Sequence, residues 1–248
     1  MSELFGCTRA VVTSRYALIT PEGLAVTQLP GWKDCAVQVG ISPRLMGPRF
    51  TQLQVGFGAE GLGEGNTGAS EYFVYVLEGA GSIGLVDKRH RLDSGSFVYL
   101  PPGTDLQFKS NGPHFKLLIF QKLYEPHAGV QRPTVLVGHQ KEVKAQPHPG
   151  NPDVRVQGLL PDNASFDLAV SLWTHPPGAA LPSVETPIVE QGGVMLKGQG
   201  ICRLADGYHP VCAGDTIWSA AYCPRWFVAM GRTPATFILY RGVNRDPM

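Results

Sequence analysis

The residues best suited to chemistry lie in and after the stretch ETPIVEQGGVMLKGQG, residues 185–200. Glu185 and Gln191 offer oxygen ligands, and the Glu185 carboxylate can also accept a proton or anchor a cation. Arg225 and Arg241 follow, and a guanidinium can bind a carboxylate or a ureido oxygen through paired hydrogen bonds. The stretch has no paired histidines. On these residues alone we predict no tight transition-metal site.

An internal repeat organises the elements that must position these residues. The segment 71–103 aligns without a gap on a second copy in the C-terminal half. The glycines that coincide at one constant offset are Gly79 with Gly198, Gly81 with Gly200, and Gly95 with Gly214. Both copies alternate apolar and polar residues with period two between turn residues. This pattern predicts an all-β protein whose antiparallel strands close into sandwiches or barrels.

Length and composition agree with a duplicated β-domain. The chain has 248 residues, of which 43% are hydrophobic and 17% charged, so it can bury one large core or two of ordinary size. Its glycines and prolines occur in short scattered clusters, which favours many turns. Residues 125–160 have the Pro, Gly and polar residues of a connection. We therefore place an N-terminal domain at residues 1–140 and a C-terminal domain, with the candidate site, at residues 141–248.

Charge and cysteine usage exclude several classes of partner. A formal net charge of +1 without a Lys/Arg cluster gives no electrostatic basis for binding nucleic acid or an anionic membrane. No signal peptide or long apolar run is present, so we expect a cytoplasmic protein. The cysteines are odd in number, spread out and without a CxxC motif, which predicts reduced thiols. They are Cys7, Cys35, Cys202, Cys212 and Cys223.

The layout resembles the cupins, which are jelly-roll barrels with the motifs G-x5-H-x-H-x3-4-E-x6-G and G-x5-P-x-G-x2-H-x3-N. In the second copy, Glu185, Pro187 and Gln191 stand at the first three ligand positions, and Arg225 stands at the last. The same count in the first copy gives Asn66, Gly68, Tyr72 and Leu106. The resemblance implies two tandem cupin barrels whose glycine frame is intact and whose histidines are replaced.

A closer resemblance covers residues 165–248 and, more loosely, the whole chain. The segments IWSAAYCPRWF and LYRGVNR are similar to the C-terminal cupin of the (S)-ureidoglycine aminohydrolases. These two-cupin enzymes of purine-ureide breakdown release ammonia from ureidoglycine and leave ureidoglycolate. The resemblance therefore implies a hydrolase for a small ureide or amino-acid-like molecule, with manganese as cofactor and assembly into a homo-oligomer.

The family resemblance also assigns roles to single residues. The family metal is held by a glutamate, two histidines and a glutamine, and these positions are Glu185, Pro187, Gln191 and Arg225 here. The implied metal ligands are Glu185 and Gln191, and the implied catalytic residue is Glu185. The family's substrate-contacting tyrosine and lysine fall on Phe237 and Arg241, so the implied substrate-binding residues are Glu185, Arg225, Phe237 and Arg241.

Each of these residues also has a purely structural interpretation. Glu185 and Arg225 can form an ion pair that takes the place of the metal. Gln191 can be a hydrogen-bonding barrel residue, with Glu190 on the outer face. His175 and His209 are typical of surface or half-buried histidines. The residues expected to serve packing are Trp218, Tyr222, Cys223 and Trp226.

Three functions follow, and the sequence leaves all three open. The first is the family reaction, with the metal held weakly or by other groups. The second is a metal-free cupin in which Arg225 and Arg241 bind an anionic or ureido ligand without catalysis. The third is a structural barrel closed by the pair Glu185 and Arg225. A bound metal would favour the first, an open cavity with free guanidinium groups the second, and a filled barrel the third.

Overall fold

The structure is a computed structural model that describes residues 8–45, 47–85 and 88–243. Strands dominate it, and the helical elements are the short 3-10 turns η1 (Pro21–Gly23), η2 (Pro43–Leu45) and η3 (Gln140–Glu142). The all-β prediction is confirmed. Cys7 and residues 244–245, the end of the segment LYRGVNR, lie outside the described residues.

The chain divides into two compact units that interleave along the sequence. Unit 1 combines the described part of Met1–Leu24 with Gln146–Val156 and Leu172–Arg241. Unit 2 combines Ala25–Ala145 with Gln157–Ser171 and the described end of the chain after Arg241.

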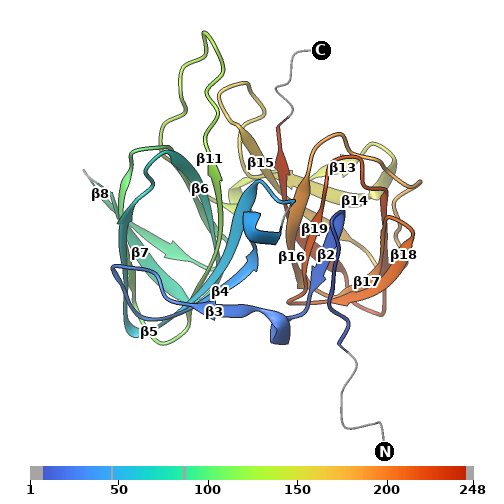
Figure 1. The fold of residues 1–248 in the computed structure, drawn as a ribbon, viewed down its shortest axis with the longest axis horizontal. Coiled ribbons are helices and arrows are strands. Elements are labelled where there is room, and N and C mark those ends of the chain that lie inside the picture. Colours follow the sequence, from blue (N-terminus) through green and yellow to red (C-terminus); the bar gives the residue numbers. More distant parts are fainter. Residues whose placement is uncertain (1–7, 46, 86–87, 244–248) are drawn as a thin grey trace, which may run out of the picture. The chain divides into compact units, whose positions relative to one another are not determined.

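This division differs from a single boundary after residue 140, because the N-terminal strand belongs with the C-terminal half. Strand β2 (Tyr16–Ile19) pairs antiparallel with β19 (Thr216–Ser219). In Figure 1 the blue β2 accordingly lies among orange strands. Leu18 explains the placement, since it is fully buried in the core of unit 1.

Unit 2 is built on a ten-stranded antiparallel sheet whose main order is β12-β9-β6-β11-β5-β10-β7-β8, with β4 on β5 and β3 on β4. The long strand β5 pairs with β11 in its first half and with β10 in its second, so one strand serves both sides of the curled sheet. The strands are β3 (Ala25–Thr27), β4 (Trp32–Ile41), β5 (Phe50–Asn66), β6 (Ser70–Glu78), β7 (Ala80–Leu85), β8 (Lys88–Asp93), β9 (Ser96–Leu100), β10 (Asp105–Ser110), β11 (Phe115–Leu123) and β12 (Leu136–His139).

Unit 1 contains an eight-stranded sheet, ordered β1-β2-β19-β16-β21-β15-β14-β13, and a three-stranded sheet, ordered β18-β17-β20. The two sheets enclose a core of buried residues that includes Leu18, Met195 and Phe227. Besides β2 and β19, the strands are β1 (Val11–Val12), β13 (Gln146–His148), β14 (Asn151–Gly158), β15 (Leu168–His175), β16 (Gln191–Lys197), β17 (Gln199–Leu204), β18 (Gly207–Cys212), β20 (Arg225–Met230) and β21 (Ala235–Gly242).

The repeated glycines occupy equivalent turns in the two units. Gly79 and Gly198 have φ values of +74° and +77°, a left-handed conformation that side chains other than glycine adopt at a cost. A Cβ atom at Gly79 would lie 2.2 Å from the His114 carbonyl oxygen, and one at Gly198 would lie 2.5 Å from that of Pro234. The glycine pattern therefore marks the same backbone turn in each repeat.

An ion pair between Arg9 and Asp215 holds the N-terminal segment against the rest of unit 1. Arg9 Nη1 lies 2.6 Å from Asp215 Oδ2, and Arg9 Nη2 lies 2.9 Å from Asp215 Oδ1. The Asp215 side chain is fully buried, whereas about a third of the Arg9 side chain is exposed. The same guanidinium also donates to the Pro210 carbonyl oxygen and to Cys212 Sγ. Because a buried carboxylate needs a partner, this pair should stabilise unit 1 measurably.

We expect Arg9→Ala to lower the free energy of unfolding by about 1–3 kcal/mol, because it removes the paired donors of a buried carboxylate. Denaturant unfolding measures the change. The control is Arg49→Ala, which breaks the ion pair with Glu125 between two exposed side chains. That variant should change stability by less than about 0.5 kcal/mol. Equal changes in the free energy of unfolding for the two variants would show that the buried ion pair stabilises the protein no more than the exposed one.

Candidate functional site

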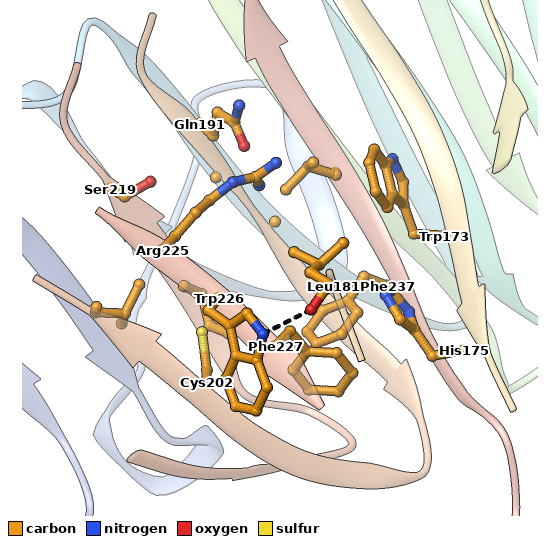
Figure 2. Close-up of a pocket in the computed structure, with 15 residues that line it drawn as sticks. Trp173, His175, Leu181, Gln191, Cys202, Ser219, Arg225, Trp226, Phe227 and Phe237 are labelled. Carbon is orange, nitrogen blue, oxygen red and sulfur yellow. Dashed lines mark hydrogen bonds between the residues drawn. The ribbon is translucent and has the colours of Figure 1, made fainter. Parts of the chain in front are cut away.

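Unit 1 contains a cavity of about 70 Å³. Strands β15, β16, β17, β19, β20 and β21 contribute to its wall, which is mostly apolar and rich in aromatic rings. Figure 2 shows Trp173, Trp226, Phe227 and Phe237 among the side chains around it. The polar side chains in the wall are His175, Gln191, Ser219 and Arg225.

The cavity lies in unit 1 because small or polar residues there replace large ones of the repeat. At the constant offset of the repeat, Val74, Ile83 and Leu100 of unit 2 correspond to Gly193, Cys202 and Ser219 of unit 1. The three unit 2 side chains are fully buried in one hydrophobic core, and the three unit 1 residues line the cavity. Likewise Leu106 and Tyr72 correspond to Arg225 and Gln191. The repeat thus keeps the barrel frame in both units and hollows one of them.

Glu185 and Arg225 form an ion pair beside the cavity. Arg225 Nη2 donates to Glu185 Oε2 at 2.9 Å, and the side chains are 17% and 30% exposed, respectively. Two backbone hydrogen bonds also join these residues, from Glu185 N to Arg225 O and from Arg225 N to Glu185 O. The Arg225 guanidinium lies 5.9 Å from the centre of the Trp173 ring, within the range of a cation–π contact. The guanidinium is therefore held in place by backbone, carboxylate and ring.

His148 is a neighbour of this pair that the sequence analysis did not single out. Its Nε2 lies 3.9 Å from Glu185 Oε1, and its ring lies 5.1 Å from that of Trp173. The backbone N–H of Gly150 donates to His148 Nδ1, which leaves Nε2 to carry the proton of the neutral ring. No motif or spacing points to His148, because β13 lies far from Glu185 in the sequence.

His175 was expected to be an ordinary surface or half-buried histidine, and this is wrong. It is 2% exposed at the end of β15 and lines the cavity. Its ring packs edge-on against Phe227 at 4.9 Å and Phe237 at 6.3 Å. Burial lowers the pKa of His175 from 6.5 to about 4, and repulsion from His148 and Arg225 adds to this shift. A neutral imidazole therefore faces the cavity at physiological pH.

The remaining residues assigned by resemblance separate into two groups. Gln191 is 5% exposed and lines the cavity, as does Phe237. Arg241 is opposite Gln191 in the pairing of β16 with β21, but it is exposed and does not line the cavity. Pro187 accepts a hydrogen bond from the Tyr222 backbone N–H. The structure thus places Gln191, Arg225 and Phe237 in one cavity wall, with Glu185 paired to Arg225, and leaves Arg241 exposed outside that wall.

Several structural expectations can be compared directly with the fold. Trp218 is buried, and its Nε1 donates to Glu190 Oε2, away from the cavity wall. Trp226 lines the cavity and donates from Nε1 to the Leu181 carbonyl oxygen, the dashed line in Figure 2. Tyr222 was expected to serve packing, and this is wrong. Its side chain is 64% exposed, because the turn before β20 points it to solvent at a φ of +59°.

The thiols of unit 1 are poor nucleophiles. Cys202 lines the cavity, and burial raises the pKa of its thiol to about 12. Cys223 is fully buried outside the cavity wall, and burial raises the pKa of its thiol as well. Since the thiolate is the reactive form, both cysteines serve packing at neutral pH. His209 is half-buried as expected and packs on the Tyr16 ring at 5.4 Å.

The donor set around Glu185 does not fit the metal that the family resemblance implies. Pro187 has no side-chain donor, and the Arg225 guanidinium stands at the last ligand position, 2.9 Å from the carboxylate that would hold the cation. In residues 8–45, 47–85 and 88–243, no three or more His, Cys, Asp and Glu side chains converge as a metal site. A cation beside a guanidinium would be repelled, so this arrangement offers the divalent ion no suitable cage.

Two curled barrels on one repeated glycine frame, with a cavity at the ligand positions of one of them, define a two-domain cupin. Solved structures share this fold. The Escherichia coli protein Ylba matches with a TM-score of 0.86 and 26% identity over 98% of this chain and 97% of that one. Bacillus subtilis oxalate decarboxylase, a protein with Mn(II) centres, matches with a TM-score of 0.72 and 12% identity over 99% of this chain and 80% of its own.

Curated relatives define the family more closely. A probable (S)-ureidoglycine aminohydrolase of Oryza sativa subsp. japonica is 32% identical over all of this chain and 79% of its own length. The (S)-ureidoglycine aminohydrolase of Escherichia coli K12 is 30% identical over 96% of this chain and 92% of its own. No protein-family model matches the chain. The chain belongs to the (S)-ureidoglycine aminohydrolase family. In the described part of the chain, no helix is long and apolar enough to cross a membrane.

The lowered pKa of His175 predicts a specific loss of stability in acid. The unfolded chain takes up a proton on this residue as pH falls below 6.5, whereas the folded chain does so only near a pKa of about 4. The stability that the neutral His175 contributes is therefore fully present above pH 6.5, and it is lost progressively as the pH falls from 6.5 to about 4. At about 1.4 kcal/mol per unit, the loss amounts to about 3 kcal/mol at pH 4.

Denaturant unfolding at a series of pH values measures this loss. In His175→Phe the pH dependence between 6.5 and 4 should be shallower by about 3 kcal/mol in total, because the titrating group is absent. Other acid-titrating groups contribute equally to both proteins. Parallel curves for the two proteins would mean that His175 titrates normally in the folded state.

Proposed function

We propose that this protein binds a small carboxylate of the ureide or amino-acid type in the cavity of unit 1, without a transition metal. The observation that carries the proposal is the Arg225 guanidinium, which stands at the last metal-ligand position and lines the cavity. Arginine donors form charge-assisted hydrogen bonds to carboxylates, and a site with little water strengthens them.

The contacts of Arg225 leave room for such a ligand. Nη2 is engaged by Glu185, whereas Nε is buried and has no hydrogen-bond partner among the described residues. An incoming carboxylate can therefore accept from the free part of the guanidinium while the ion pair holds the group in place. For a ligand that carries an amine, the Glu185 carboxylate supplies the matching negative charge. An amino-acid-like molecule would meet both charges at once.

The family reaction is the second candidate, and the observation in its favour is the glutamate at position 185. Relatives across this chain's full length are named for ammonia release from ureidoglycine. In that reaction the geminal amine leaves as ammonia and water supplies the hydroxyl of the product. Glu185 would accept a proton, with His148 Nε2 at 3.9 Å as its neighbour. The barrel would have to do this without the metal cage that the family resemblance implies.

The third candidate, a structural barrel, rests on the same ion pair. A pair of Glu185 and Arg225 is what this alternative requires, and it is present. The alternative also requires a filled barrel, whereas unit 1 encloses a cavity of about 70 Å³ with polar groups in its wall. Empty space lined by unpaired polar groups is costly for a purely structural element, so we favour ligand binding.

Isothermal titration with N-carbamoylglycine, a stable carboxylate with a ureido group, tests the proposal. We expect Arg225→Met to weaken binding at least about tenfold, because a charge-assisted hydrogen bond contributes roughly 1.5–3 kcal/mol. Arg241→Met tests the competing assignment of the anion to the exposed Arg241 side chain outside the cavity wall. Arg49→Met, on the surface of unit 2, is the control for the loss of one positive charge. A larger loss in Arg241→Met than in Arg225→Met would move the anion site out of the cavity.

Metal content and ammonia release decide between the first two candidates. After incubation with manganese, we expect the native protein to retain no stoichiometric metal and to release no ammonia from freshly generated ureidoglycine. A triple variant, Pro187→His with Gln191→His and Arg225→Gln, restores the family donor set around Glu185 and should gain manganese. Stoichiometric metal in the native protein, with ammonia release abolished by Glu185→Ala, would instead establish the family reaction.

A further inference from the structure

Three side chains in the cavity wall carry buried polar atoms without a partner. Both nitrogens of His175, Oε1 of Gln191 and Nε of Arg225 are buried and have no hydrogen-bond partner in the described part of the chain. All three residues line the same cavity. Buried polar groups are nearly always hydrogen-bonded in folded proteins, and leaving one unpaired is unfavourable. Their convergence on one cavity indicates a missing partner with several hydrogen-bonding atoms.

His175 is the group that the proposed carboxylate contact does not explain. The His175 side chain is almost fully buried, with an exposed fraction of 2%. Figure 2 shows the imidazole projecting from β15 among the other lining side chains, near Phe237 and below Trp173. The His175 ring contacts the rings of Trp173, Phe227 and Phe237, and none of these side chains forms a hydrogen bond with it.

The hydrogen-bonding capacity of the cavity can be counted. A neutral imidazole has one N–H donor and one nitrogen acceptor, and the amide oxygen of Gln191 adds a second acceptor. Together these atoms offer two acceptors and one donor. A terminal –C(=O)NH₂ group has the complementary set, with two N–H donors and one carbonyl acceptor. The donor of Arg225 then remains for a carboxylate at the other end of the ligand.

The size of the cavity agrees with this end of the ligand. Its volume of about 70 Å³ is roughly half that of a 150 Å³ cavity that takes benzene. A planar group of about four non-hydrogen atoms fits that space, and a carbamoyl group together with its attached nitrogen has four. The rings of Phe227 and Phe237, which pack edge to face at 4.6 Å, line the cavity with apolar aromatic surface against which the carbamoyl group can pack.

We propose that His175 is a ligand-contacting, specificity-determining residue that, together with Gln191, binds a terminal carbamoyl or carboxamide group. This inference rests on the proposed function for the carboxylate end of the ligand, which Arg225 binds. It adds the recognition of the opposite end by residues of this chain's own cavity wall. The occupant is a short carboxylate with a terminal –C(=O)NH₂ group.

A matched pair of probes tests this contact. N-carbamoylglycine and N-acetylglycine have the same carboxylate and nearly the same shape, and they differ by NH₂ against CH₃. We expect the native protein to bind N-carbamoylglycine at least about tenfold more tightly, because the methyl group leaves the buried acceptors unpaired. In His175→Phe the preference should fall below about threefold, while N-acetylglycine binding persists.

Two further variants keep the test independent of folding. His175→Gln retains a donor and an acceptor and should restore part of the preference for N-carbamoylglycine. His209→Phe replaces a histidine that packs on Tyr16 outside the cavity wall, so it should bind both probes as the native protein does. Thermal melting of each variant confirms that it is folded, and we expect His175→Phe to melt a few degrees higher because it removes unpaired buried nitrogens.

The outcomes separate the two proposals. Equal binding of both probes to the native protein, or an unchanged preference in His175→Phe, overturns the role of His175 and leaves carboxylate binding intact. It would mean that His175 is satisfied by water or by side-chain rearrangement. Failure of both probes to bind the native protein removes the proposed function, and the role of His175 falls with it.

Discussion

The ion pair between Glu185 and Arg225 is the contact on which the site depends. It joins the segment before β16 to the start of β20, and it is reinforced by two backbone hydrogen bonds between the same residues. A half-buried carboxylate and a half-buried guanidinium stabilise each other, whereas either one alone would have to be hydrated. The pair puts a fixed positive charge at the position where the family resemblance places a metal ligand. The chemistry available in the cavity therefore depends on a guanidinium that stands in place of a metal ligand.

The fold was largely predictable because the signals that specify it are local. Alternation with period two and the repeated glycines gave two β-barrels, and Gly79 and Gly198 adopt the same left-handed turn for the same steric reason. The exchange of β2 into unit 1 was not predictable, since no local pattern says which of two similar barrels a short apolar strand will join. That choice is made by non-local pairing with β19 and by burial of Leu18.

The site was predictable only where the motif fixes positions. Counting from the glycine frame singled out Gln191 and Arg225, which both line one cavity, and the ion pair offered as a structural interpretation is present. His148 and His175 were missed or misjudged, because their importance comes from neighbours that are distant in sequence. A lone histidine at a strand end carries no signal until the fold surrounds it with Trp173, Phe227 and Phe237. The gapless repeat contained one signal that could have located the cavity: large residues of the first copy align with small residues of the second.

That substitution pattern bears on whether the cavity is a relic or a binding site. If unit 1 had lost its metal and become merely structural, large side chains like those of unit 2 would be the stable solution, since filling a cavity adds contacts and removes unpaired polar atoms. Instead Gly193, Cys202 and Ser219 keep the space open, and His175 and Gln191 keep buried polar atoms in its wall. Each choice lowers the stability of the barrel without a ligand. A ligand that fills the space and pairs those atoms reverses that loss, and this is the energetic arrangement of a binding site.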